Sequence, residues 1–449
     1  MSSPLSAVPL SMRLAGVPEI ECVTPDLNGI PRGKVMTVDG LLGGRRLQMA
    51  RGVLLQALMG GYPEPAFFGD DDGDLELRAV PEQVHVLPWA DSPRALAVCD
   101  AVELDGTLSG LSSRTLLKRV IDQYTERNWQ PIVATELEFF VFERHLDVNQ
   151  PFQPPVGIDG RRDPGNAAFS VSSSNGLRPF FDEIKVGMAA LGIARDTFMH
   201  EMGVSQFEIN FVHGDPLLIA DQTFLFKHML HEVALKHGLI AVCMAKPLAR
   251  VPGCSMHIHQ SVIEKTHGRN IFTDPRNNEP TFSFQHFIGG LQLCLADLTL
   301  LMAPNINSYQ RFCHVFASPN NLCWAEDNRS AGLRIPASTP DARRVENRLP
   351  GADANPYLAI AASLAAGFYG IDNEIEPSAP VSGQFAAPDH LKLPGSLHEA
   401  INRLSRSSLA RELFDDEFID GYLATKTLEL EHFLDEITPW ERRYLGAQV

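Results

Sequence analysis

The stretch TELEFF, Thr135–Phe140, decides how this sequence is interpreted. It lies in PIVATELEFFVF, residues 131–142, a run of branched and aromatic residues that predicts a β-strand. Side chains alternate between the two faces of a strand, so Glu136 and Glu138 point to the same side. Two carboxylates this close repel each other, and burial increases the repulsion. A pair of divalent cations is the simplest way to stabilise them, although two solvated glutamates on a strand face would need no cation.

Three downstream stretches repeat this alternation: SQFEINFV at 205–212, SMHIHQSV at 255–262 and RRVENRL at 343–349. Each is predicted to form a short strand with apolar residues behind or near its polar face. The polar faces carry Gln206, Glu208 and Asn210; Ser255, His257, His259 and Ser261; and Arg344, Glu346 and Arg348. Chance would explain one or two such strands, but four together predict a curved sheet whose concave face holds a ligand.

The chain has 449 residues, which is long for one hydrophobic core and predicts two domains. Its 44% hydrophobic and 21% charged residues are typical of a soluble globular protein. A net charge of −17 argues against a nucleic-acid partner, because sequence-independent binding needs a basic surface. Local arginine clusters can still hold phosphate groups against that field.

The seven cysteines are spread along the chain without a Cys-X-X-Cys motif, which favours a reducing, cytoplasmic location. The N-terminal residues MSSPLSAVPLSMR lack the apolar core of a signal peptide. The longest apolar runs, such as 358–366, are too short to cross a bilayer, so no membrane partner is expected.

The first part of the chain predicts a small α+β domain that ends near residue 110. A short helix is expected at Arg51–Met59, and residues 60–80 are expected to form a loop. The acidic run GDDDGD in this loop could bind a metal, but a solvated loop is the simpler interpretation. Strands are predicted at Glu19–Thr24, Gly33–Val38, Val84–Leu87 and Ala95–Val102.

The remaining chain predicts helices interleaved with the four polar strands. A helix at 114–128 follows Ser112 and Ser113, which can cap it, and residues 143–177 form a long connection rich in Pro, Gly and Ser. Three amphipathic helices are expected between Ser396 and Tyr444. Further elements are predicted as helices at Phe180–Leu191, Asp215–His237, Phe282–Met302 and from Asn355 to about Phe368, and as a strand at Leu239–Met244.

Six side chains are candidate metal ligands: Glu136, Glu138, Glu201, Glu208, His257 and Glu346. Five carboxylates and one imidazole form a hard donor set, which suits Mg²⁺ or Mn²⁺ better than structural zinc. They are accompanied by an arginine series, Arg311, Arg329, Arg334, Arg344 and Arg348. Arginines beside a carboxylate–metal site indicate phosphoryl transfer, although surface ion pairs would be another use for them. No Walker-type or kinase-type glycine loop is present, so a nucleotide site would be built another way.

These stretches resemble the motifs of glutamine synthetases, in order, over residues 16–445. They are ELEFF, HEMGVSQFE, FKHMLHEVALKHGLIAVCMAKP, SMHIHQS, NSYQR, NRSAGLRIP and RRVENRLPGADANPYL. The resemblance implies an α+β fold with an N-terminal β-grasp-like domain, residues 16–110, and a catalytic domain of curved antiparallel sheet and helices, residues 111–449. It also implies six-membered rings, as a hexamer or a dodecamer, in which a neighbour's N-terminal domain completes each active site.

The resemblance implies ATP and two or three Mg²⁺ or Mn²⁺ ions as cofactors. One metal position would use Glu138, Glu201 and Glu208, and the other would use Glu136, His257 and Glu346. The carboxylate of L-glutamate would be held by Arg311 and Arg348, with Gly253 and Glu138 nearby. Arg311 and Arg329 would be catalytic, Arg329 by stabilising the transferring phosphoryl group. The ATP side would be formed by Ser261, His259, Arg344 and Arg329.

Two departures from this resemblance concern the nitrogen substrate. Ammonia-using enzymes of the family carry a Glu in the loop after NSYKR, whereas this chain has Ala317 in RFCHVFASPNN. Their ammonium-binding Asp has no clear counterpart, because MGGYPEP occupies that region. An ammonium ion needs negative groups to bind it and to accept its proton, so their loss favours a substituted amine. DLNGIPRGK and WAEDNRS, at 26–34 and 324–330, are more similar to the γ-glutamylpolyamine synthetase branch, and Trp324 could line an amine pocket or belong to the core.

We therefore predict an ATP-dependent ligase that joins the γ-carboxylate of L-glutamate to an organic amine through a γ-glutamyl phosphate. Three alternatives stay open: an ammonia-using glutamine synthetase, a non-catalytic ring of the same fold, and a metal-dependent hydrolase that uses the His-X-His strand. The retained ligands argue against the non-catalytic ring, because a scaffold has no physical need for them, and the arginines argue against the hydrolase. The sequence names neither the amine nor the number of subunits.

Overall fold

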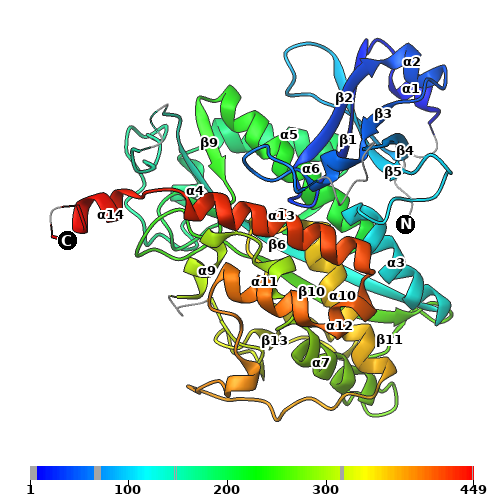
Figure 1. Ribbon diagram of the computed structural model, residues 1–449, viewed down its shortest axis with the longest axis vertical. Coiled ribbons are helices and arrows are strands. Elements are labelled where there is room, and N and C mark those ends of the chain that lie inside the picture. The colour runs from blue at the N-terminus through cyan, green and yellow to red at the C-terminus, as the bar shows by residue number, and fades with distance from the viewer. Residues whose placement is uncertain (1–7, 65–71, 146, 148, 314–317, 447) are drawn as a thin grey trace.

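The structure, a computed structural model, describes residues 8–64, 72–145, 147, 149–313, 318–446 and 448–449. Two β-sheets and the helices around them organise this part of the chain (Figure 1). The α+β class predicted from the sequence is confirmed. Within the described residues, no helix is both long enough and apolar enough to cross a membrane.

The first sheet is built from the N-terminal residues and is drawn in blue and cyan in Figure 1. Its described strands pair in the order β2-β1-β5-β4-β3, with β1 and β5 parallel and the other neighbours antiparallel. Three short helices flank it: α1 (Leu10–Arg13), α2 (Val38–Leu42) and the 3₁₀ helix η2 (Arg51–Leu55). The strands are β1 (Glu19–Pro25), β2 (Pro31–Thr37), β3 (Gln48–Ala50), β4 (Asp74–Val86) and β5 (Arg94–Val102).

The second sheet contains nine strands among the described residues, and all four predicted polar strands belong to it. The main path runs β12-β13-β14-β10-β6-β8-β7, while β9 pairs with β6 and β11 pairs with β10. The strands are β6 (Trp129–Glu143), β7 (Arg195–His200), β8 (Gln206–Phe211), β9 (Leu239–Val242), β10 (Met256–Glu264), β11 (Arg269–Asn270), β12 (Trp324–Glu326), β13 (Leu333–Ile335) and β14 (Val345–Asn347). The long strand β6 therefore lies near the middle of the sheet, between β10 and β8.

Helices cover the sheet and begin where the sequence places capping residues. Ser112 accepts a hydrogen bond from Thr115 N, and Asp215 and Asn355 cap helices whose first residue is proline. The helices are α3 (Ser113–Glu126), α4 (Val171–Asn175), α5 (Arg178–Ala190), α6 (Pro216–Lys236), α7 (Phe282–Cys294), α8 (Thr299–Met302), α9 (Ile306–Phe312), η4 (Pro340–Ala342), α10 (Pro356–Asp372), η5 (Asp389–Leu391), α11 (Leu397–Arg406), α12 (Ser408–Leu413), α13 (Asp416–Leu434) and α14 (Pro439–Tyr444).

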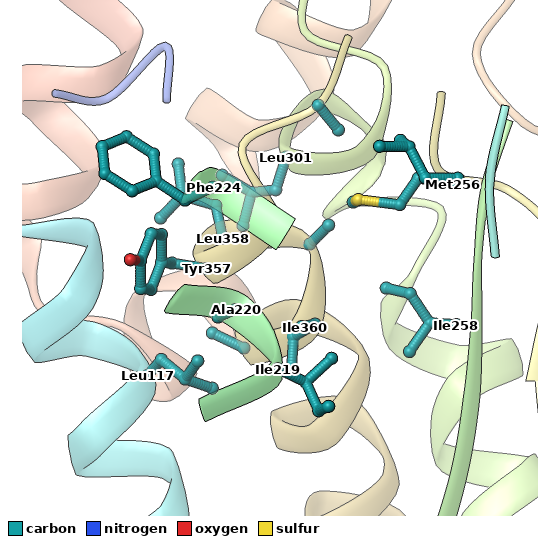
Figure 2. Packing of buried hydrophobic residues seen from close by; sticks show 14 of the residues in the cluster. Leu117, Ile219, Ala220, Phe224, Met256, Ile258, Leu301, Tyr357, Leu358 and Ile360 are labelled. Atoms are coloured by element: carbon teal, nitrogen blue, oxygen red, sulfur yellow. The ribbon is translucent and has the colours of Figure 1, made fainter. Parts of the chain in front are cut away.

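The core lies between these helices and the second sheet. Figure 2 shows Leu117 of α3, Phe224 of α6 and Tyr357 of α10 packed together, with Met256 and Ile258 of β10 on the sheet side. All five side chains are buried. Burial of this apolar face holds β10 in place, so the opposite-facing side chains of the strand are available for a site.

Four predictions about elements were wrong. The helix expected at Arg51–Met59 is only the 3₁₀ helix η2, and the strand expected from Val84 belongs to β4, which already begins at Asp74. Pro81 hid this strand, but a register shift between Ala79 and Val84 accommodates it. The single helix predicted at 282–302 is divided into α7 and α8, and the C-terminal region has four helices instead of three. The first half of the GDDDGD run, residues 69–71, lies outside the described residues. In the second half, Asp72 accepts a hydrogen bond from Gly52 N at 2.9 Å, and Asp74 begins β4.

A buried charge network joins the first sheet to helices α3, α6 and α10. The guanidinium of Arg114 on α3 binds both carboxylate oxygens of Asp221 on α6 at 2.9 Å and also contacts Asp100 of β5. Tyr357 of α10 donates its hydroxyl proton to Asp221 at 2.6 Å. The predicted domain boundary at 110/111 falls between β5 and α3, next to this network, and stays a prediction.

Candidate active site

Strand register places the predicted acids and histidines opposite one another. Glu136 of β6 is paired with His257 of β10, and Glu138 of β6 is paired with Glu208 of β8. On the other side of β10, His259 is paired with Glu346 of β14. Directly opposed residues lie close on one sheet face, so three pairings gather most of the candidate ligands.

The first group of possible ligand atoms comes from Glu136, His257 and Glu346, within 4.8 Å of one another. His257 Nδ1 lies 3.3 Å from Glu136 Oε2 and 3.7 Å from Glu346 Oε1. Burial by itself would raise the pKa of Glu136, but hydrogen bonds with His257 and His259 outweigh it and hold the pKa below its ordinary value. Burial and the nearby Arg348 lower the pKa of His257 to about 4, so its imidazole is neutral and able to bind a metal.

The second group comes from Glu138, Glu208 and His257, whose ligand atoms also lie within 4.8 Å of one another. Burial and the charge of Glu201 raise the pKa of Glu138 to about 8. Burial and the charges of Glu138 and Glu136 raise the pKa of Glu208 to about 9. Glu138 and Glu208 cannot both be ionised near neutral pH without a cation between them.

An unsatisfied atom indicates that these residues fit a metal. Nε2 of His257 is buried and has no hydrogen-bond partner among the described residues. A buried imidazole nitrogen without a partner is costly, and a cation bound to this ring would remove that cost. The donor set of carboxylates and one neutral imidazole suits Mg²⁺ or Mn²⁺.

Glu201 lies outside both groups, although the sequence places it with Glu138 and Glu208. It follows β7, and its Oε2 accepts a hydrogen bond from Met202 N at 3.2 Å. Its charge still raises the pKa of Glu138 and Glu208, so the side chain faces the same region. The preceding His200 bridges Asp163, at 2.7 Å, and the carbonyl oxygen of Glu201, at 2.6 Å, which ties this corner to the long connection before α5.

Arg311 of α9 is a buried cation next to the second group. Its Nη1 donates to Leu349 O at 2.8 Å, and its Nη2 donates to Arg348 O at 2.8 Å and to Ser255 Oγ at 3.0 Å. Burial lowers its pKa to about 10, which still leaves it charged at neutral pH. Gly253 lies against its side chain, since a Cβ there would be 2.9 Å from Arg311 Cγ.

The remaining predicted residues lie at the edge of the first group. His259 accepts a hydrogen bond from Arg344 Nε at 3.1 Å on Nδ1, so its protonated Nε2 donates to Glu136 at 2.8 Å. Ser261 follows on the same face of β10 and is half-buried. Arg329 is exposed and makes no hydrogen bond or ion pair with any described residue, although its charge acts to lower the pKa of Glu201.

A comparison with known proteins identifies the fold that carries this site. The sequence profile of the glutamine synthetase catalytic domain matches residues 110–445. The chain belongs to the glutamine synthetase family. Members of this family use ATP and divalent metals, act on small molecules and are oligomeric. The predicted fold, with an N-terminal sheet domain before a glutamine synthetase catalytic domain, is confirmed.

Two relatives and one solved structure illustrate the range of this glutamine synthetase family. The glutamate–isopropylamine ligase of Pseudomonas sp is 31% identical over 438 residues, covering 94% of this chain and 93% of the relative. The glutamine synthetase of Pyrococcus abyssi is 32% identical over 426 residues, covering 93% and 91%. The structure "Apo GmaS without ligand" is similar with a TM-score of 0.82 and 26% identity over the full length of both chains. Identity alone therefore does not separate amine-using from ammonia-using members.

Three residues that the sequence analysis named without individual roles contact the candidate ligands. Gln206 donates to Gly253 O at 2.9 Å and to Glu138 Oε2 at 3.3 Å, and Ser255 N donates to the same Oε2 at 2.8 Å. Arg334, which had been given no role, contacts Glu346 Oε2 at 2.6 Å. The signal for Gln206 and Ser255 was present, because both alternate with predicted ligands on their strands, whereas the position of Arg334 depends on the pairing of β13 with β14.

Trp324 and Ala317 both concern the nitrogen substrate, and only Trp324 is among the described residues. Trp324 is half-buried and donates its indole N–H to Ser378 O at 2.7 Å, a contact that favours a structural role. Ala317, which carries the argument against ammonia, lies outside the described residues.

Proposed function

We propose that this protein is an ATP-dependent ligase that joins the γ-carboxylate of L-glutamate to an organic amine through a γ-glutamyl phosphate. The observation that carries the proposal is the pair of adjoining carboxylate–imidazole groups on one sheet face with the buried Arg311 beside them. Such a site neutralises phosphate oxygens and holds a carboxylate at the same place, which is what acyl phosphate formation requires.

We infer that Glu138, Glu201 and Glu208 would hold one metal position, and that Glu136, His257 and Glu346 would hold the other. Two or three Mg²⁺ or Mn²⁺ ions would screen the phosphate oxygens of ATP and the charge that develops as the phosphoryl group moves. Support for the ligand sets comes from the two groups described above and from the buried, unpartnered Nε2 of His257. Glu201 would have to turn toward Glu138 and Glu208 to take part.

The arginines would bind the reacting groups. Arg311 and Arg348 would hold the carboxylate of L-glutamate, with Gly253 leaving space for it and Glu138 nearby. The ATP side would be formed by Arg344, His259 and Ser261. On that side, hydrogen bonds from Arg344 to His259 and from His259 to Glu136 fix the orientation of the imidazole. Arg329 would stabilise the transferring phosphoryl group, and its exposed, unpaired side chain leaves it available to do so.

An organic amine is favoured over ammonium by the sequence. Of the two acidic groups that the ammonia-using relatives are expected to use, the Asp has no clear counterpart in MGGYPEP, and Ala317 stands at the position of the Glu in RFCHVFASPNN. The glutamate–isopropylamine ligase provides a precedent for a small alkylamine. The glutamine synthetase of Pyrococcus abyssi, at nearly equal identity, keeps ammonium as the second candidate substrate.

The test is phosphate release from ATP with Mg²⁺ or Mn²⁺ and L-glutamate, in the presence of ammonium or of a panel of amines. The panel contains alkylamines, an ethanolamine, a diamine and a polyamine, and products are identified by mass. We expect turnover with at least one organic amine and little turnover with ammonium. Strong turnover with ammonium alone would identify a glutamine synthetase, and release of phosphate without a γ-glutamyl product would contradict ligation.

We further propose that the chain assembles into a hexamer or a dodecamer in the cytoplasm. Assembly is supported by the oligomeric state of the family, and location is supported by the cysteine usage. The mass of the assembly in solution distinguishes the two states.

A further inference from the structure

A short loop connects the region after β9 to β10 beside Arg311. We call residues 246–253 the Lys246 loop. Its two ends meet because Cys254 N donates a hydrogen bond to Ala245 O at 2.8 Å. At its C-terminal end, Gly253 packs so tightly that a Cβ would lie 2.4 Å from Ala245 O and 2.9 Å from Arg311 Cγ. The loop therefore forms one wall of the space around Arg311.

Asn307 of α9 clamps the start of this loop. Its Oδ1 accepts a hydrogen bond from Lys246 N at 2.8 Å, and its Nδ2 donates to Lys246 O at 2.9 Å. Asn307 and Arg311 are four residues apart, so they lie on the same face of α9. One helix consequently fixes both the loop and the guanidinium that the loop covers.

Lys246 closes the loop from within. Its ammonium group donates to Val251 O across the loop, and the side chain is buried, with 7% of the residue exposed. At the far end of the loop, Gly253 O accepts from Gln206 Nε2, which also reaches Glu138. The loop is thus attached at its start to α9, internally through Lys246, and at its end to the strand that carries the second ligand group.

We propose that Asn307 and Lys246 are positioning residues that hold the Lys246 loop against Arg311 and thereby set the affinity of the site for L-glutamate. The proposal rests on the proposed function for the identity of the substrate. Its physical basis is that Arg311 is fixed on one side by the carbonyl oxygens of Arg348 and Leu349 and on the other by Gly253. If the loop moves away, the guanidinium loses the second of these constraints.

The first experiment measures the order of the loop without any ligand. Arg250 is exposed in this loop, so trypsin can cut the bond before Val251 once the loop opens. We expect Asn307→Ala and Lys246→Met to speed cleavage after Arg250 about tenfold or more, because each loses hydrogen bonds that keep the loop closed. Lys246→Arg, which retains a donor, should recover most of the protection. The exposed Lys392→Met is the control and should cleave as the wild type does.

The second experiment measures kinetics with L-glutamate, ATP and the best amine. We expect Asn307→Ala and Lys246→Met to raise the KM for L-glutamate about tenfold, while kcat and the KM for ATP change less than about twofold. A purely structural role would instead lower activity and thermal stability together, with no separation between the two substrates. Unchanged cleavage after Arg250, or an equal loss in all kinetic constants, would overturn the proposal. A wild type without turnover would contradict the proposed function, whereas the trypsin result would still decide whether these residues hold the loop.

Discussion

Glu138 and Glu208 face each other between β6 and β8, and their burial controls the protonation of the site. With pKa values of about 8 and about 9, both hold a proton near neutral pH when no cation is present. Metal ligands must be ionised, so a divalent cation that binds at the proposed position of Glu138 and Glu208 would release these protons.

This linkage predicts how metal binding depends on pH. The ordinary pKa of both carboxyls is 4.5, so the metal-free folded protein binds more protons than the unfolded chain between that pH and about 8. The stability of the metal-free protein should therefore fall as pH rises through this range, while affinity for Mn²⁺ should rise between about pH 6 and pH 9. Calorimetry in buffers of different ionisation enthalpy measures the released protons. Glu208→Gln should release fewer, and pH-independent binding would contradict the assignment.

The environment of Glu346 leads to a second prediction about a single residue. It is buried, and Arg348, Arg334 and His257 surround its carboxylate. Glu346→Ala should lower ATP-dependent phosphate release at least about 100-fold, because loss of a ligand is expected to cost no less than loss of a supporting residue. Glu326→Ala, on the exposed end of β12, is the control and should retain activity. Near-normal turnover of Glu346→Ala would exclude it from the metal site.

Strand alternation was sufficient to predict which side chains the second sheet brings together on one face. Glu136, Glu138, Glu208 and His257 come together because each strand has one apolar face in the core, which leaves the other face for ligands. Glu201 follows the end of β7, where no alternation fixes its direction, and the structure leaves it outside both groups. A pattern along one strand also says nothing about neighbours in space, which explains the missed contact of Arg334 with Glu346.

At the scale of elements, local patterns were reliable where a capping residue or an alternation marks the end. Ser112, Asp215 and Asn355 each cap the helix that the sequence predicts. The break between α7 and α8 has no such mark, because residues 295–298 read LADL, without a proline, a glycine or a capping residue predicted from the sequence. Asp297 in this break binds Arg403 at 2.9 Å and Ser407 at 2.7 Å, and these tertiary contacts are invisible to periodicity.

The buried charge network around Asp221 predicts that its substitution has a large effect on stability. Asp221 accepts hydrogen bonds from Arg114 and Tyr357, and all three side chains are buried. Asp221→Ala should reduce the free energy of unfolding by about 3–5 kcal/mol, because Arg114 keeps its charge and loses its main partner. Urea unfolding followed by circular dichroism measures the change. The exposed pair of Arg127 and Asp372 is the comparison, since Asp372→Ala should cost less than about 1 kcal/mol.

At the scale of the whole molecule, the C-terminal helices tie the N-terminal sheet domain to the rest. Figure 1 shows α13 crossing the molecule toward the first sheet, with α14 extending away from the body. The fully buried Lys426 of α13 contacts Asn28 in the turn after β1, and Glu429 accepts a hydrogen bond from Leu58 N at 3.0 Å. These contacts hold α13 in place, whereas none of the α14 residues is buried in the described structure.

The exposed apolar side chains between the end of α13 and the start of α14 predict contact with a second copy of the chain. Leu434, Ile437 and Trp440 are 69%, 60% and 61% exposed, which is costly for apolar side chains so close together. Glu436 lies between Leu434 and Ile437, and Arg443 follows Trp440. Neither forms an ion pair with the residues that the structure describes. Two copies packed antiparallel would bury the apolar residues and bring each Glu436 toward the partner's Arg443, as a two-fold contact requires.

In the proposed dodecamer a two-fold contact of this kind would join the two six-membered rings, so its loss should halve the mass of the assembly. We expect Trp440→Glu to have this effect in light scattering or mass photometry, because it buries a charge at the centre of the contact. Glu436→Arg and Arg443→Glu should each weaken the assembly through like-charge repulsion, and the two together should restore it. Restoration by the double variant separates a specific pairing from general damage to α14. An unchanged mass for Trp440→Glu would show that the contacts between subunits lie elsewhere, with this apolar segment left facing water.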